Sequence, residues 1–135
     1  MEILISLLLT SIVVLGIFAA QGQQTQKAVT LKQYMLASLG LRNMAEKMLA
    51  NQISMQGNDY TESYKSQVKD CINLNCNPRE MAAYDINTTV NEMREHLPQF
   101  ELKIIAQTAG DYKLSASWQG LTKSQTLDLK ISAGQ

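Results

Sequence analysis

The first part of the chain changes from a wholly apolar pattern to a one-sided one. Residues 3–20 carry no charged side chain, and their polar side chains are Ser6, Thr10 and Ser11. Eighteen residues in a helix would span about 27 Å, close to the roughly 30 Å hydrocarbon core of a bilayer. No proline interrupts the run. The pattern predicts an apolar helix that anchors the chain in a membrane, between its start and residue 20.

The predicted anchor consists of large apolar side chains, namely Ile3, Leu4, Ile5, Leu7, Leu8, Leu9, Ile12, Val13, Val14, Leu15, Ile17 and Phe18. A cleaved secretory signal is disfavoured because no basic region precedes the run and no suitable pair of small residues marks a cut near Ala20. A buried helix of a globular core is also disfavoured, since the rest of the chain is too polar to surround it. Glu2 does not fit a plain anchor, because it places a carboxylate at the start of the apolar run.

The following residues predict that the helix continues with one apolar face. From residue 27 to 55 helix-forming residues dominate, and apolar ones recur at spacings of three and four, at Tyr34, Ala37, Leu41, Met44 and Met48. The simplest expectation is a single helix from about residue 2 to 54. Gly57, followed by Asn58 and Asp59, is a helix stop signal. Residues 60–69 are predicted to form a loop with at most one helical turn.

A second helix is predicted from about residue 78 to 97. Asn77 is a good N-cap, Pro78 suits the first helical position, and Glu80 completes a capping box. Pro98 stops the helix. Its expected buried face consists of apolar residues at helical spacing, namely Ala82, Ile86, Val90, Met93 and Leu97.

The last third of the chain predicts three antiparallel strands, because apolar and polar residues alternate there. Turns are expected at 109–111 and 119–120. The apolar rows are Phe100, Leu102 and Ile104, then Tyr112, Leu114, Ala116 and Trp118, then Leu127, Leu129 and Ile131. Three strands cannot bury one face alone, so the apolar stripe of the long helix is expected to cover them. The predicted fold class is α+β, with the long helix packed on a three-stranded antiparallel meander beside the second helix.

Cys71 and Cys76 are the only cysteines, and they are predicted to form a disulfide in an oxidising compartment. Its expected role is to fix the loop before the second helix. Two reduced thiols are the alternative. Zinc is disfavoured because His96 is the only histidine. A redox pair is disfavoured because the spacing is not C-x-x-C.

Composition and motifs narrow the function classes. The 135 residues suffice for one small domain beside an anchor, and the zero net charge gives no indication of a nucleic-acid partner. The sequence contains no phosphate-binding loop, no nucleophile elbow and no metal-ligand spacing. His96 is expected to be a solvated residue at a helix end. We therefore expect no catalytic residue, no metal and no cofactor.

The start of the chain, MEILISLLLTSIVVLGIFAAQ, resembles the type IV pilins. The match is to the family's glutamate followed by an apolar helix, E-x-L-[IV]-[AS]-L-L. Residues 11–16 and 20–21 look like the minor pilins similar to the type IV pilus modification protein PilV. A second resemblance covers residues 76–85, CNPREMAAYD, with Leu97-Pro98 downstream, and Ser117-Trp118-Gln119 is similar to the family's late strand.

This resemblance implies a lollipop-shaped pilin-like fold and a role in a filament. Residues 1–20 would be the transmembrane and filament-core half of the helix, and residues 21–135 a periplasmic head. Glu2 would pair with the N-terminal amine of a neighbouring subunit as the helix leaves the bilayer. The alternative places Glu2 among lipid headgroups, where a carboxylate at a helix N-terminus is also favourable.

The resemblance also implies processing and partners. A basic leader ending in glycine, expected upstream of Met1, would be cut by a prepilin peptidase, and the mature N-terminus would be methylated. The partners would be other minor pilins, the major pilin, membrane lipid and the inner-membrane assembly platform. The chain would reside in the inner membrane before entering a filament at the cell surface. Motility, adhesion, DNA uptake and secretion stay open as the filament's task. Proline near residue 20, frequent in major pilins, is missing.

Three other functions stay open. A minor pseudopilin of the type II secretion system shares the same helix and a similar head. A single-pass membrane-anchored periplasmic sensor or adhesin subunit would never enter a filament. An anchored enzyme is the most distant alternative.

Overall fold

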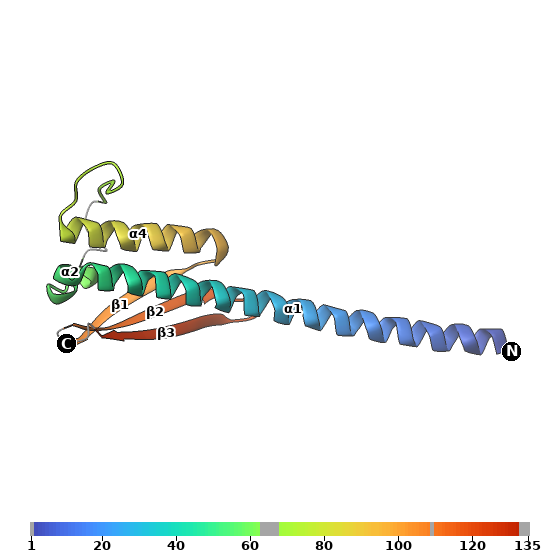
Figure 1. Cartoon of the computed structure of the whole chain (residues 1–135). Coiled ribbons are helices and arrows are strands. Elements are labelled where there is room, and N and C mark those ends of the chain that lie inside the picture. The colour runs from blue at the N-terminus through green and yellow to red at the C-terminus, as the bar shows by residue number, and fades with distance from the viewer. Residues whose placement is uncertain (1, 63–67, 109, 133–135) are drawn as a thin grey trace. The chain divides into compact units, whose positions relative to one another are not determined.

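A computed structural model of the 135-residue chain describes residues 2–62, 68–108 and 110–132. The chain divides into two units, Met1–Lys32 and Gln33–Gln135. Unit 1 consists of the first part of helix α1, which runs from Glu2 to Ala50 and is drawn in blue to green in Figure 1. The long N-terminal helix that the sequence predicts is thus confirmed.

The end of α1 differs from the prediction, because the helix stops at Ala50 instead of continuing to about residue 54. Asn51 has non-helical dihedral angles, φ −106° and ψ 61°, and a short helix α2, Gln52–Gln56, follows it. The Asn51 side-chain amide donates a hydrogen bond of 2.8 Å to the carbonyl oxygen of Pro78. After this break, Ser54 and Met55 of α2 are buried.

The stop signal after α2 also acts differently from the prediction. Gly57 keeps right-handed dihedral angles, with φ −79°, and its amide donates to the Ile53 carbonyl. Asn58 takes the left-handed conformation instead, with φ 59°. Asparagine tolerates this conformation better than most residues do. One further helical turn, α3 from Asp59 to Glu62, follows and buries Tyr60, while the predicted loop at 63–67 lies outside the described residues.

Helix α4, Pro78–His96, confirms the predicted second helix and its capping box. The Asn77 side chain accepts a hydrogen bond from the Glu80 amide, and the Glu80 carboxylate accepts one from the Asn77 amide, both at 2.8 Å. Leu97 caps the C-terminal end. Ala82, Ile86, Val90 and Leu97 are buried as predicted, and Met93 is partly buried against the core.

The three predicted strands form one antiparallel sheet with the order β1-β2-β3. Strand β1 runs from Glu101 to Thr108, β2 from Asp111 to Gln119, and β3 from Ser124 to Ser132. Gly110 lies in the first turn with φ 89°, a conformation that glycine adopts without steric cost. The register is continuous between β2 and β3, whereas a shift between Ala106 and Thr108 interrupts the pairing of β1 with β2.

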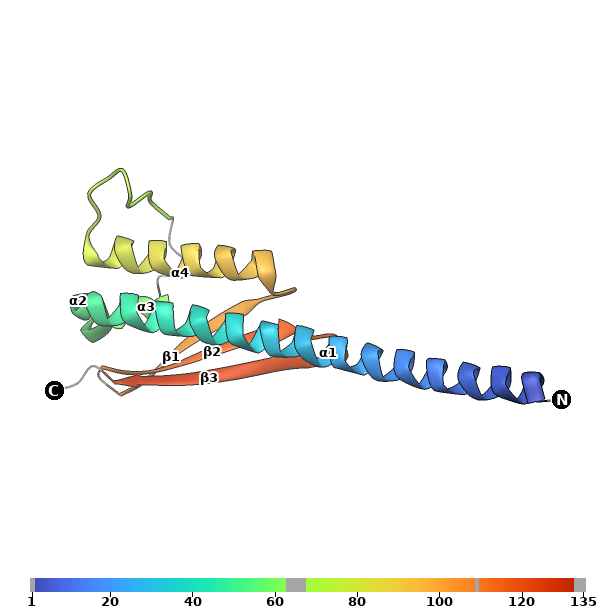
Figure 2. The same cartoon turned by 45° about the vertical axis from the view of Figure 1, so that its right-hand side comes forward.

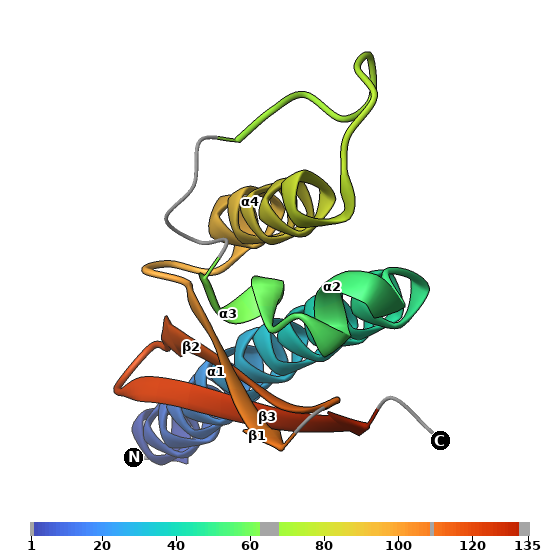
Figure 3. The same ribbon diagram turned by 90° about the vertical axis from the view of Figure 1, so that its left-hand side faces the viewer.

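The core of unit 2 lies between the sheet and two helices. Residues 33–50 of α1 and helix α4 lie on the same side of the sheet (Figures 1 and 3). The Tyr34 ring packs edge-to-face on Trp118, with ring centroids 5.1 Å apart, and its hydroxyl donates to Gln125. A Cβ on Gly40 would lie 2.5 Å from the Met93 sulfur, so the missing side chain lets α1 and α4 approach closely.

Burial of the predicted stripe on α1 should dominate the stability of unit 2. Met44 is fully buried, whereas Met35 on the same helix is 70% exposed. We expect Met44→Ala to lower the free energy of unfolding by about 2–5 kcal/mol, because it removes buried atoms and leaves a cavity. Met35→Ala should change it by less than about 0.5 kcal/mol. Urea unfolding followed by Trp118 fluorescence checks both, and equal losses would contradict this packing.

Candidate functional site

The apolar segment at the start of α1 leaves its side chains uncovered within unit 1. The twelve large apolar side chains of residues 3–18 each expose between 48% and 76% of their surface. Soluble monomers rarely expose a contiguous apolar surface of this kind. Glu2 is the first residue of α1, and the structure describes its backbone but not its side chain.

Two polar side chains in this segment bond to the helix that carries them. The Thr10 hydroxyl lies 3.0 Å from the carbonyl oxygens of both Ser6 and Leu7, and the Ser11 hydroxyl donates to Leu7 and lies 3.2 Å from the carbonyl oxygen of Leu8. Such bonds satisfy a hydroxyl without water. Thr10 and Ser11 therefore do not prevent the segment from lying in an apolar environment.

Among the described residues, no helix combines the length and the apolar character that crossing a membrane requires. The membrane anchor stays a prediction.

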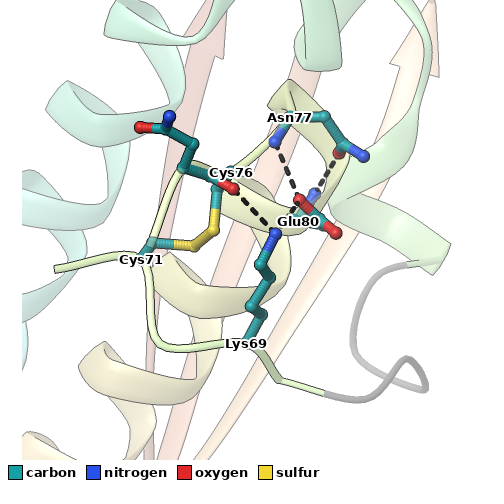
Figure 4. Close-up of polar contacts among 6 residues, drawn as sticks. Lys69, Cys71, Cys76, Asn77 and Glu80 are labelled. Atoms are coloured by element: carbon teal, nitrogen blue, oxygen red, sulfur yellow. Dashed lines mark hydrogen bonds and ion pairs between the residues drawn. A yellow bond between two sulfur atoms is a disulfide. The ribbon is translucent and has the colours of Figure 1, made fainter. Parts of the chain in front are cut away.

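The disulfide loop ahead of α4 is the second predicted feature, and the structure joins Cys71 to Cys76 (Figure 4). The Cα atoms are 5.5 Å apart. Lys69 crosses the loop, because its ammonium donates to the Asn75 carbonyl at 2.7 Å and to the Glu80 carboxylate at 3.3 Å. The loop is thus tied both to itself and to the first turn of α4.

Two carboxylates stabilise this loop while ionised. The Asn77 amide and the Lys69 ammonium lower the pKa of Glu80 below its usual range. The side chain of Asn73 and the amide of Ile72 lower the pKa of Asp70 in the same way. Stability from these groups is present above the carboxyl pKa of the unfolded chain and is lost as the pH falls through the lowered folded values.

The disulfide loop, residues 68–76, contributes no fully buried side chain to the core. Ile72 is 77% exposed and Leu74 is 55% exposed. The disulfide and the Lys69 contacts therefore hold a surface loop in place and add nothing to the core.

Removing the disulfide should loosen this loop more than the rest of the molecule. For a six-residue ring, loop closure is worth about 2 kcal/mol. We expect the Cys71→Ser/Cys76→Ser variant to lose about that much or less in the free energy of unfolding. Hydrogen exchange should rise in residues 68–77 and stay unchanged in β2, and uniform loosening of both would contradict the local role.

A buried carboxyl group next to this loop was missed by the sequence analysis. Asp85 on α4 is only 8% exposed, and the Tyr60 hydroxyl donates to it at 3.2 Å. The same hydroxyl lies 3.4 Å from the Lys47 carbonyl oxygen, and the Lys47 ammonium lies 3.3 Å from Thr89 Oγ1. Asp85 follows Ala82 by three residues on α4, so helical spacing already placed it on the predicted buried face.

Burial and neighbouring charges shift the pKa values of two groups in this cluster. Burial raises the pKa of Asp85, and the nearby Lys47 ammonium and the Tyr60 hydroxyl oppose the rise. Burial, reinforced by Asp85, raises the pKa of Tyr60 well above its usual value. A cavity of about 420 Å³ adjoins the cluster, and its lining residues are Lys47, Ala50, Asn51, Cys76, Asn77, Pro78, Met81 and Asp85.

The cluster joins α1, α3 and α4 by hydrogen bonds. Among the described residues that line the cavity, Asp85 is the only one with a carboxyl group, Lys47 carries an amine, and the Cys76 sulfur is bound in the disulfide. His96 is exposed in the last turn of α4. In the described residues, no group of three or more acidic, histidine or cysteine side chains could hold a metal ion.

The raised pKa of Asp85 predicts a pH dependence with a definite sign. Between the unfolded pKa near 4 and the raised folded value, the folded state binds more protons, so the free energy of unfolding falls as the pH rises. Asp85→Asn should remove this loss, so the variant gains stability relative to the parent chain as the pH increases.

Asp128→Asn is the matched control for this change, with the opposite sign. Hydrogen bonds from Lys113 and Ser115 lower the pKa of Asp128. The stability that this carboxylate provides is therefore lost as the pH falls. Urea unfolding at several pH values measures both differences, and a parallel pH profile for Asp85→Asn and the parent chain would contradict the assignment.

Comparisons with protein-family models, with curated proteins and with solved structures gave no match for this chain.

Proposed function

We propose that this chain is a minor pilin, a structural subunit that helps to initiate or assemble type IV pili. The observation that carries the proposal is the exposed apolar segment of α1, residues 3–18, directly preceded by Glu2. The resemblance of this stretch to the pilin N-terminus gives the arrangement its functional interpretation. An acid at the head of an apolar helix is compatible with a simple anchor, where it would lie among headgroups, but in a filament it would also guide assembly.

The exposed side chains need a cover from outside the described chain. At roughly 25 cal/mol per Å² of apolar surface, leaving twelve large side chains in water would be strongly unfavourable. Lipid can supply the first cover, and the apolar helices of neighbouring subunits can supply the second. Because Thr10 and Ser11 bond to their own helix, both environments accept them.

Glu2 would favour transfer of the helix from lipid to the neighbouring subunits. A carboxylate at bilayer depth costs a few kcal/mol. An amine from a neighbouring subunit would offset that cost in an assembled helical core. Removing one partner of a buried ion pair typically costs about 3–5 kcal/mol. This pairing would therefore favour one register between neighbouring helices.

The Cys71–Cys76 disulfide supports a periplasmic location for the head, because disulfides persist in oxidising compartments. In this proposal the chain resides in the inner membrane and then at a filament tip, with other minor pilins and the major pilin as partners. A type II secretion pseudopilin would use the same helix. The subunits that copurify with the chain distinguish these two memberships.

Glu2→Ala tests the proposal in cells. We expect the amount of this chain in sheared filaments to fall by more than ~10-fold, because the buried pair is lost. Its amount in the membrane fraction should stay unchanged. Glu46→Ala is the matched control, since Glu46 is an exposed carboxylate on the same helix. Normal incorporation of Glu2→Ala would refute the role of Glu2 in assembly. Absence of the parent chain itself from sheared filaments would refute the pilin assignment and favour a sensor or adhesin subunit that never enters a filament.

A further inference from the structure

Strand β3 has an unpaired edge within the described residues. In the part of the chain that the structure describes, β3 pairs with β2 alone, and no strand pairs with its other side (Figure 2). Proteins usually protect such edges with bulges, proline or a covering element. The opposite edge strand, β1, has an irregular register near Thr108 and lies against α3. Residues 124–132 have a continuous register and contain no proline or glycine, so the charged side chains of Asp128 and Lys130 are the protection that they carry.

The core-facing side of β3 is incompletely covered. Leu127, Leu129 and Ile131 are only partly buried, although their partners on β2 are fully buried. A groove of about 100 Å³ lies beside them, and its lining residues are Ser38, Leu41 and Arg42 from α1 with Leu127, Asp128 and Leu129 from β3. This space suits one aliphatic side chain that enters along the strand edge.

The solvent-facing side of β3 carries an uncompensated positive charge. Lys130 lies directly opposite Lys113 in the ladder, and like charges in this arrangement are destabilising. Asp128 binds the Lys113 ammonium at 2.7 Å and the Ser115 hydroxyl at 2.6 Å. The Lys130 side chain forms no hydrogen bond or ion pair with the described residues. A carboxylate on the open side of β3 would neutralise it.

We propose that the free edge of β3 binds an extended strand of another protein, antiparallel to β3. Main-chain hydrogen bonds would provide affinity, and alternate side chains would provide specificity. The residue opposite Lys130 carries a carboxylate on the solvent-facing side. The next residue, opposite Leu129, carries an aliphatic side chain that enters the groove at Leu41.

A second copy of this chain is a less suitable occupant. Pairing two β3 strands about Leu129 would place Asp128 opposite Lys130 of the other copy, but Asp128 already binds Lys113. Residues 33–50 of the two copies would also run in opposite directions. Two copies anchored in one membrane by the same helix cannot have these segments antiparallel. This one argument rests on the proposed function.

A synthetic strand tests the proposal on the full chain in detergent. The probe is the capped peptide SQTLDLKIS, the sequence of β3, which can place its aspartate opposite Lys130. Unlike Asp128 in a second copy, the aspartate of the peptide has no Lys113 to bind. We expect it to slow hydrogen exchange in residues 124–132 by at least ~5-fold and to leave β1 unchanged. A scrambled peptide should have no effect. Absence of protection, or protection of β1 instead, would overturn the proposal.

Charge reversal tests the predicted contact. Lys130→Glu should weaken binding of the peptide about three- to ten-fold, and a peptide with lysine in place of its aspartate should restore it. Lys123→Glu is the matched control in the preceding loop and should bind normally. Lys130→Gln gives a second, uncharged variant. Loss without rescue would overturn the predicted register.

Self-association tests the choice of occupant. Sedimentation of the full chain in detergent should show no dimer formed through β3. A dimer that the Lys130→Glu substitution dissociates would overturn the assignment of the edge to another protein. Because these measurements use purified protein, their result is independent of the filament test on Glu2.

Discussion

The packing of residues 33–50 of α1 on the sheet is the contact on which the rest of unit 2 depends. A three-stranded sheet cannot bury its apolar face by itself. The stripe that includes Leu41, Met44 and Met48 supplies the missing cover, and β2, the central strand, receives most of it. Helix α4 then completes the core from the same side of the sheet (Figure 3). The edge strands receive less cover, and this leaves the groove beside β3.

The same helix raises the functional question, because its first part has no such cover in unit 1. Residues 3–18 expose apolar side chains on all sides, whereas residues 33–50 bury only one face. A chain that keeps this surface needs lipid or other helices around it. The proposed pilin role provides both in succession, with Glu2 favouring the second. The disulfide loop and the β3 edge then offer surfaces through which a head could contact neighbouring proteins.

The spacing of apolar residues predicted the helices and strands. Each element buries one face, so its apolar residues recur with the period of its backbone. The alternation in 111–119 and the capping box at Asn77 were sufficient for β2 and the start of α4. The break at Asn51 has no local signal in the sequence, and the hydrogen bond that accompanies it is to Pro78, which is distant in sequence. The Asp85 cluster was missed for a similar reason. Its partner Tyr60 comes from a turn whose position no local pattern specifies.

In the proposed role, other pilin subunits cover the apolar start of α1. Site-specific photo-cross-linking in cells, from a probe that replaces Leu9 in the exposed segment, tests it most directly. We predict covalent adducts with other pilins that become abundant when filaments assemble. A probe that links only to lipid while filaments form, or to a protein that belongs to no filament, would contradict the account.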